Sequence, residues 1–188
     1  MKKIFTFIFA ALAVVFMHVP FMSHAEAAWV AVVPIDINVD GVERATDFNS
    51  YYWDIMIDKF QYPDYELMDD DKVATAVPEN GLKSYDKATL LEIADKLDAD
   101  VVVAMKLDKI EEKPISFRRE PTLSTFMQGE YAGYNRQTGK YYYKKMYLRG
   151  EIEEVLTLRN DWQQMTFASE LKRYINRTLE DKKAKVKF

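Results

Sequence analysis

The sequence predicts a single α/β domain that becomes α+β in its second half, built on one mixed sheet of about five strands. Three observations support this prediction. Short apolar runs alternate with helical periodicities up to about residue 110, which is typical of a βαβ arrangement with parallel strands. Two strand-like arms then flank a turn, as in an antiparallel hairpin. An amphipathic C-terminal segment predicts a helix that closes the fold.

The first half begins with a strand, a helix and a second strand. Residues 29–35 (WVAVVPI) are almost wholly apolar, as in a strand buried on both faces, and residues 41–60 carry apolar side chains at helical spacing. Residues 65–68 (YELM) predict a second short strand. The aspartates at 69–71 predict an N-cap and favourable charge at the start of a short helix that ends at Val77.

A further helix and a central strand follow. Ser84 is a suitable N-cap for a helix that ends near residue 97, and residues 101–107 (VVVAMKL) predict a buried central strand. Residues 111–121 contain two prolines and predict a polar loop. The apolar side of the helix is predicted to consist of Leu90, Leu91, Ala94 and Leu97.

The hairpin has arms at residues 123–134 and 141–156, joined by a turn near Thr138 and Gly139. Because side chains alternate along a strand, odd residues of the first arm share a face with even residues of the second, and a four-residue turn keeps this relation. One face is then apolar, with Leu123, Met127, Tyr131, Met146, Leu148 and Ile152. The other face is aromatic and charged, with Phe126, Glu130, Tyr134, Tyr143, Lys145, Tyr147, Arg149 and Glu151.

The last helix is predicted over about residues 162–182, followed by a basic tail at 182–187. The tail suits a solvated helix end, and weak contact with anionic envelope polymers is the functional alternative. The apolar stripe of this helix consists of Ala168, Leu171, Ile175 and Leu179.

The N-terminus predicts export. Residues 1–27 combine a basic start, a long apolar run and the small-residue pattern Ala25-x-Ala27 of a cleaved signal peptide. A retained membrane anchor is the alternative, and Pro20 and the lack of a second apolar segment disfavour it. We therefore expect one exported domain over residues 28–188, periplasmic or extracellular, with no membrane span after cleavage. No cysteine follows the apolar run, so the sequence predicts a soluble product that is not a lipoprotein.

The composition excludes several function classes. The formal net charge is −4, which argues against nucleic acid as a partner. Both histidines, His18 and His24, lie in the predicted signal peptide, and the chain contains no cysteine. Ser-His-Asp and Cys-His catalysis, typical zinc sites and disulfides are therefore excluded from the exported domain. An enzyme would need carboxylates, a Ser–Lys pair or an oxygen-ligated metal.

Residues 36–47 (DINVDGVERATD) have the outline of an EF-hand calcium loop, with Gly41 at its sixth position. An EF-hand requires a preceding helix, whereas a buried strand is predicted before this segment. Asp40 and Glu43 also form a capping-box pattern for the helix that follows. A strand–helix corner is therefore favoured, and calcium remains the alternative. The candidate calcium ligands are Asp36, Asn38, Asp40 and Asp47.

Three segments carry a family resemblance: VAVVPIDIN, YELMDDDKV and LLEIADKLDADVVVAMKLDKI. Over about residues 29–110 they resemble the core of exported envelope α/β domains. That group includes the amino-terminal domain of TolB, the curli-secretion lipoprotein and the lipoprotein activators of penicillin-binding proteins. The resemblance implies a compact sheet backed by helices and non-enzymatic work through protein contacts. The shared positions are core positions, so no functional residue carries over. This chain departs from the group at Ala104 and Met105, where a glycine is expected, and is too short for the TolB propeller.

The aromatic and charged face of the hairpin is the candidate contact surface. Tyrosine and arginine are favoured at protein interfaces, so we expect a non-enzymatic binding or accessory protein whose partner is an envelope protein or a second copy of the chain. A solvated sheet face, sugar stacking, and coverage by the last helix are the alternatives. The candidate partner-binding residues are Tyr134, Tyr143, Lys145, Tyr147 and Arg149.

Two patterns suggest catalysis only weakly, and no catalytic residue is assigned. Ser169 and Lys172 match the S-x-x-K of penicillin-recognising enzymes, but no S-D-N or K-T-G follows. A carboxylate-dependent enzyme acting on envelope glycans is the alternative function class. The carboxylates considered for it are Glu130, Glu151, Glu153 and Glu154.

Overall fold

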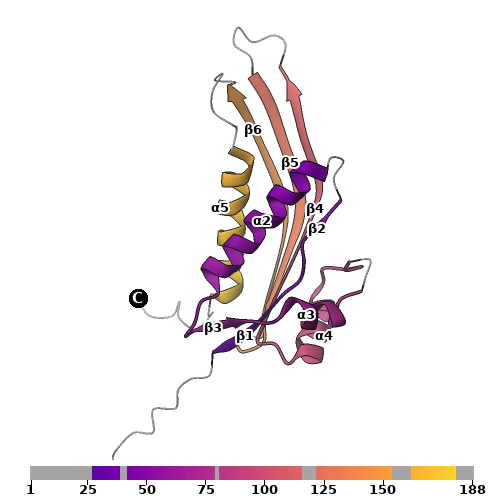
Figure 1. The fold of residues 1–188 in the computed structure, drawn as a ribbon, viewed down its shortest axis with the longest axis vertical. Helices are drawn as coiled ribbons and strands as arrows, with labels where there is room; N and C mark the ends of the chain where they lie inside the picture. Colours follow the sequence, from indigo (N-terminus) through magenta and orange to yellow (C-terminus); the bar gives the residue numbers. More distant parts are fainter. Residues whose placement is uncertain (1–26, 39–41, 79–80, 116–121, 154–161, 181–188) are drawn as a thin grey trace, which may run out of the picture.

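A computed structural model of the chain describes residues 27–38, 42–78, 81–115, 122–153 and 162–180 (Figure 1). Its elements form one mixed sheet in the order β3-β1-β4-β5-β6, with the short β2 also paired to β4. The strands are β1 (Ala28–Val32), β2 (Asp36–Ile37), β3 (Tyr65–Leu67), β4 (Val101–Pro114), β5 (Thr122–Asn135) and β6 (Lys140–Glu153). The helices are α2 (Val42–Lys59), α3 (Asp70–Ala76), α4 (Lys87–Leu97) and α5 (Trp162–Leu179).

The strand pairing confirms the predicted fold class. β1 runs parallel to β3 and β4, and β2 runs parallel to β4, as expected for a βαβ-type first half. β4, β5 and β6 are antiparallel neighbours along almost their whole lengths. The C-terminal helix α5 packs on this antiparallel part of the sheet. None of the helices in the described ranges is long and apolar enough to cross a membrane.

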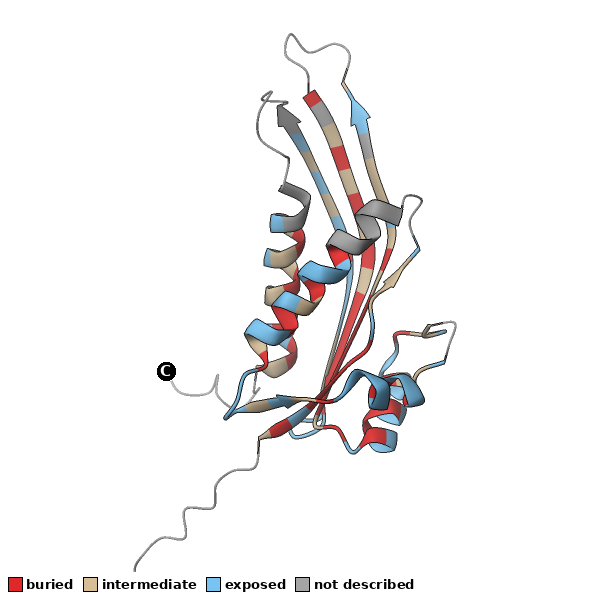
Figure 2. Cartoon of the chain, in the orientation of Figure 1, coloured by how far each residue is buried: buried red, intermediate tan, exposed pale blue. Residues whose placement is uncertain are grey.

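Helices cover the two faces of the sheet unequally, and we call the face under α2 and α5 the inner face. Its core includes Val101, Val103 and Met105 of β4. The alternate β4 residues Val102 and Ala104 join a second core on the outer face, which α3 and α4 cover only near β1 (Figures 1 and 2). This double coverage explains why the start of β4 is apolar at every position, because a strand buried on both faces has no solvent-facing side.

The hairpin has the predicted parity. Asn135 pairs with Lys140 across a four-residue turn, so odd residues of β5 share a face with even residues of β6. Met127, Tyr131 and Met146 are fully buried in the inner-face core with residues of α5. The alternative that the last helix covers the aromatic and charged face is therefore wrong, because α5 packs on the opposite side.

The central strand β4 is longer than predicted. It continues through Pro114, whereas the sequence predicted a loop from residue 111. The reason is the antiparallel partner β5, which pairs with β4 up to Leu123 opposite Pro114. Proline is tolerated at this last position because a strand end does not require its missing N–H donor.

Two helix starts test the capping predictions. Asp69 caps α3 as predicted, and its carboxylate accepts the Asp71 N–H at 3.0 Å. Ser84 is not the N-cap of α4, because Asp86 accepts the Thr89 N–H at 2.8 Å while the Ser84 hydroxyl donates to Asp86 at 2.7 Å. Ile93 is buried on α4, and the predicted stripe member Leu91 is exposed.

Candidate contact surface and cleft on the outer face

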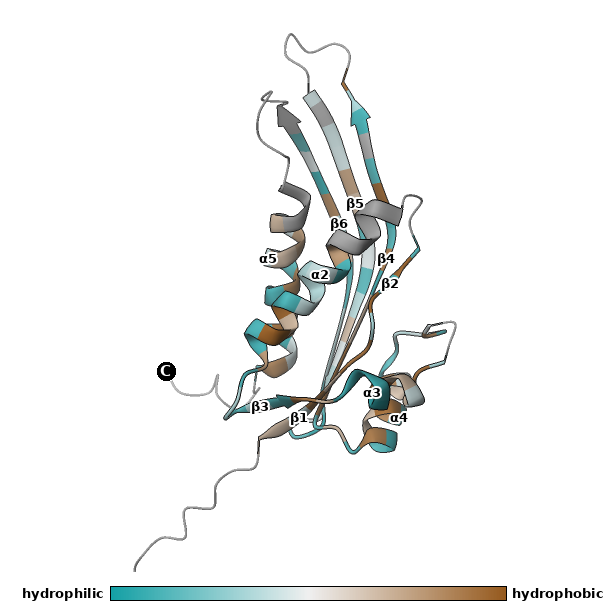
Figure 3. Ribbon diagram, viewed as in Figure 1, coloured by the Kyte–Doolittle hydropathy of each residue, from teal (hydrophilic) through white to brown (hydrophobic). Residues whose placement is uncertain are grey.

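The structure brings four of the five predicted partner-binding residues together on the outer face of β6. Tyr143 and Tyr147 are 37% and 58% exposed, and Lys145 and Arg149 are exposed beside them. All four occupy odd positions of one strand, so their side chains leave the same face. The distal parts of β4 and β6 are largely hydrophilic (Figure 3). The outer face is therefore a mixed aromatic and charged surface, with Glu130 and Glu151 on the same side as Lys145 and Arg149.

Tyr134 does not belong to this exposed surface. It is only 6% exposed and packs in the outer-face core, with Lys87 Nζ 5.8 Å from the centroid of its ring. Its cross-strand neighbour Tyr141 is half-buried and donates its hydroxyl to the carbonyl of Tyr85 at 2.6 Å. The tyrosines nearest the turn thus support α4 and the segment before it, and the exposed surface begins at Tyr143.

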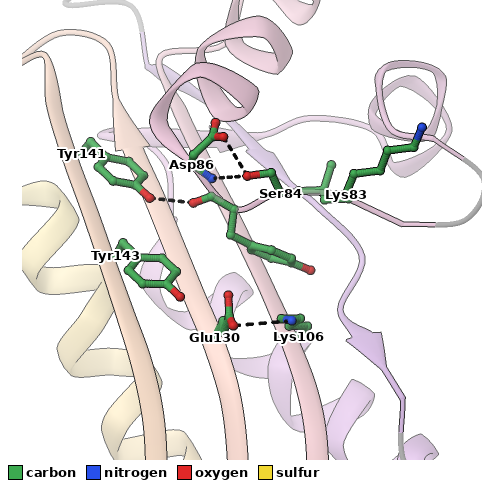
Figure 4. A pocket seen from close by; sticks show the side chains of 9 residues that line it. Lys83, Ser84, Asp86, Lys106, Glu130, Tyr141 and Tyr143 are labelled. Atoms are coloured by element: carbon green, nitrogen blue, oxygen red, sulfur yellow. Dashed lines mark hydrogen bonds and ion pairs between the residues drawn. The ribbon is translucent and has the colours of Figure 1, made fainter.

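A polar cleft of about 470 Å³ lies between this surface and the segment that precedes α4 (Figure 4). Three adjacent strands contribute to its floor, because Lys106 of β4 and Glu130 of β5 are register partners and Tyr143 follows on β6. The side chains that line the cleft are Leu82, Lys83, Ser84, Tyr85, Asp86, Lys106, Glu130, Tyr141 and Tyr143.

Ion pairs hold the floor of the cleft. Lys106 Nζ lies 3.5 Å from a Glu130 carboxylate oxygen and 3.2 Å from an Asp108 oxygen. It also lies 5.8 Å from the centre of the Tyr85 ring, within reach of a cation–π contact. Burial acts to lower the pKa of Lys106, but the hydrogen bonds and charges of Asp108 and Glu130 raise it above its usual value. The ammonium therefore stays charged.

The phenols that face the cleft stay protonated at neutral pH. Burial, followed by the neighbouring Glu130 carboxylate, raises the pKa of Tyr143 to about 12. Burial, and then the charges of Asp36, Asp108 and Glu130, raise the pKa of Tyr85 above its usual value. Figure 4 shows the Tyr143 hydroxyl directed toward Glu130. These groups can hydrogen-bond a ligand, but they do not offer a proton shuttle near pH 7.

The sequence prediction did not include Lys106 and Tyr85 in a site. Lys106 could have been identified from the sequence, because it is the first charged residue in an otherwise apolar central strand. Tyr85 could not have been, because it lies in a connection whose position over the sheet depends on the packing of α4.

The candidate calcium ligands are only partly described. Asp36 lies in β2, Asn38 is exposed after it, and α2 begins at Val42. Asp40 lies outside the described residues, and the side chain of Asp47 is likewise not described. Among the residues that the structure does describe, no group of three or more acidic or histidine side chains could hold a metal. Calcium stays a prediction, which calorimetric titration with millimolar calcium tests.

The residues considered for catalysis do not form a site in the described part of the chain. Lys172 pairs with Asp58 of α2 at 2.9 Å, and Ser169 is exposed on α5. Glu130 lies opposite Lys145, so Glu151 is six residues further along β6, roughly 20 Å away at the rise of a strand. Glycosidase carboxylates lie about 5–10 Å apart. The side chain of Glu153 is not described.

Several predictions concern segments outside the described residues. These are most of the signal peptide at 1–27, Glu154 and the basic tail at 182–187. They remain predictions of the sequence.

No protein-family model matches the chain, and no curated protein is similar to it in sequence. Some solved structures resemble it. A putative neuraminyllactose-binding hemagglutinin homolog from Helicobacter pylori is 13% identical with a TM-score of 0.47, and the match covers 88% of this chain and 94% of that one. Lipoprotein GNA1162 from Neisseria meningitidis is 13% identical with a TM-score of 0.43, covering 80% and 99%.

The C-terminal domain of LpoB from Salmonella enterica is 12% identical with a TM-score of 0.37, covering 69% of this chain and 84% of that one. LpoB belongs to the penicillin-binding-protein activators that the sequence resemblance named. The resemblance to the TolB domain and to the curli lipoprotein stays a prediction. At these identities and TM-scores, the similarities carry no argument about function.

Proposed function

We propose that this chain is a non-enzymatic, exported accessory protein of the cell envelope that binds another protein through the outer face of β6. One observation carries the proposal: Tyr143, Lys145, Tyr147 and Arg149 are exposed together on a part of the sheet face that no described helix covers, while the inner face is packed under two helices. Exposed tyrosine and arginine supply large contact areas, cation–π contacts and hydrogen bonds, and both are enriched at protein interfaces.

The cleft beside this surface supports a binding role. It offers neutral phenols and the Lys106–Glu130 ion pair next to Tyr143, which suits the capture of one polar side chain of a partner. The pKa values of these tyrosines are raised away from neutrality, so the cleft is better suited to recognition than to general acid–base chemistry.

Affinity capture from the organism's own envelope tests the proposal. The double substitution Tyr147→Ala with Arg149→Ala is expected to abolish capture of a partner that the unchanged protein retains. Tyr51→Ala is the matched control, because Tyr51 on α2 is as exposed as Tyr143, at 37%, but lies on another element. Equal loss of the partner with both variants would contradict a specific role of the outer face.

The enzyme alternative makes a different prediction. If the protein cleaved envelope glycans through carboxylates, the triple substitution Glu130→Gln, Glu151→Gln and Glu153→Gln would abolish glycan release from purified envelope material. We expect no glycan release with the unchanged protein. Cleavage that disappears in the triple variant would overturn the non-enzymatic proposal.

A further inference from the structure

Within the described part of the chain, the outer edge of β6 is the longest edge of the sheet that has no strand partner. β6 spans 14 residues at one end of the strand order, whereas β3 at the other end spans three. Among the residues that the structure describes, β6 pairs only with β5. A long edge strand presents a row of backbone donors and acceptors, and such a row is completed by another strand.

The side chains along β6 are arranged for pairing with a second copy of itself. Its first part is basic, with Lys145 near the middle, and its end is acidic, with Glu151. In an antiparallel pair with the twofold axis at Leu148, each Lys145 lies opposite Glu151 of the other copy. Tyr147 then lies opposite Arg149 on the same outer face, which suits a cation–π contact.

Registers centred on Tyr147, Arg149 and Gly150 are less favourable than the register centred on Leu148. Two residues that lie directly opposite each other in an antiparallel pair project from the same side of the sheet. The twofold axis of a β6–β6 pair must therefore pass through a residue, and each alternative register moves it by a whole number of residues. An axis at Tyr147 places Lys145 opposite Arg149, and an axis at Arg149 places the two guanidinium groups opposite each other. An axis at Gly150 pairs Arg149 with Glu151, but it uses only the last seven residues of the strand and leaves Lys145 outside.

From this complementarity we propose that two copies of the chain join their sheets through antiparallel β6–β6 pairing centred on Leu148. The dimer is closed by its twofold axis, because the β6 edge of each copy is covered by the other copy. Among the described residues, the edges that stay unpaired are shorter: β3, β2 and the part of β4 beyond Leu107. It also brings two outer faces side by side, so the contact surface becomes continuous across both copies. The dimer uses Tyr147 and Arg149 of the same outer face as the proposed envelope contact, but it concerns the chain alone, so its test needs only the purified protein.

Charge reversal tests the register. Sedimentation of the purified exported protein is expected to show a dimer, and Lys145→Glu or Glu151→Lys alone is expected to weaken self-association by about tenfold, since two ion pairs become two repulsions. An equimolar mixture of the two variants restores complementary pairs in a heterodimer and is expected to recover the dimer. A monomeric unchanged protein, an ineffective Lys145→Glu, or a mixture that stays monomeric would each overturn the proposal.

A second experiment applies if a charge variant fails to fold. The chain contains no cysteine, so Tyr147→Cys and Arg149→Cys provide single thiols on the two facing positions. Mild oxidation of their mixture is expected to give the mixed disulfide in preference to either symmetric one, while Tyr51→Cys on α2 gives none above background. Absence of the mixed disulfide would contradict the register. Failure of either experiment leaves the envelope-capture result unaffected, so the two proposals can be separated.

Discussion

The two faces of the β5–β6 hairpin both carry tyrosine, but they use it differently. On the inner face, Tyr131 is fully buried, shares a hydrogen bond of 2.9 Å with Thr178 and packs against Tyr174 at 5.5 Å between ring centroids. On the outer face, Tyr147 is 58% exposed and lies among charged residues. The same residue type therefore contributes core packing on one side and accessible surface on the other.

The contrast between Tyr131 and Tyr147 shows that strand parity and helix placement together decide whether a tyrosine of the hairpin is buried or exposed. Parity assigns each tyrosine to a face, and α5 then selects one face as core. Among the described elements, those that cover the outer face of the hairpin are α4 and the segment before it, near the turn, where Tyr134 is buried. A strand surface that is left open in this way can bind a partner without a cost to the core.

The largest expected effect is a difference in the free energy of unfolding between Tyr131→Ala on the inner face and Tyr147→Ala on the outer face. Tyr131→Ala removes a fully buried ring and its bond to Thr178, and we expect a loss of about 3–5 kcal/mol in the free energy of unfolding. Tyr147→Ala is expected to change it by less than about 0.5 kcal/mol. Urea unfolding at one protein concentration measures both. Equal losses would contradict the assignment of the two faces.

Gly133 tests how closely α5 approaches the inner face. A Cβ added there would lie 2.3 Å from Thr178 Oγ1 and 2.7 Å from the Tyr131 hydroxyl oxygen. Gly133→Ala is therefore expected to cost about 1–3 kcal/mol by overpacking.

The matched control for this change is Thr178→Ala, alone and combined with Gly133→Ala. Because Thr178→Ala removes the nearest atoms, the double variant is expected to lose less stability than the sum of the two single variants. Strict additivity would mean that α5 does not pack on Gly133 as described.

Tyrosines on the two faces are also expected to contribute differently to the loss of stability at alkaline pH, although this effect is smaller. Burial raises the pKa of Tyr131 above its usual value, and burial and Glu130 raise that of Tyr143 to about 12. A tyrosine with a raised pKa in the folded state contributes stability that is complete below about pH 10, where the unfolded chain ionises, and is lost as the pH rises toward its folded-state pKa. Tyr131→Phe is expected to reduce this alkaline loss more than Tyr143→Phe does, because Tyr131 is fully buried whereas Tyr143 is 37% exposed and solvent screens its interactions.

Urea midpoints measured from about pH 9 to pH 11 check this order. A larger change with Tyr143→Phe than with Tyr131→Phe would contradict it.

Much of the fold could be predicted, because its determinants are local. The run at 101–107 identified the central strand, Asp69 identified the cap of α3, and the hairpin parity followed from alternation alone. Parity was predictable even though the turn spans residues 136–139, since four-residue and two-residue turns leave the same faces aligned.

The remaining features depend on tertiary packing that no local pattern encodes. β4 contains a register shift between Leu107 and Lys109, so the residues that face outward change from even to odd numbers beyond it. The burial of Tyr134 depends on α4, and the cleft depends on where Tyr85 settles over β4 and β5. Residues in the exposed part of the candidate surface were identified because they lie on one strand, whereas Lys106 and Tyr85 come from elements far apart in sequence.

Radical footprinting of tyrosines tests most directly whether the outer face of β6 binds a partner. The protein is probed in its native envelope and, at the same concentration, after purification. We predict that Tyr143 and Tyr147 become protected in the envelope, while Tyr62, which is 81% exposed between α2 and β3, keeps its reactivity. Unchanged reactivity of Tyr143 and Tyr147, with or without protection of Tyr62, would contradict binding at this face.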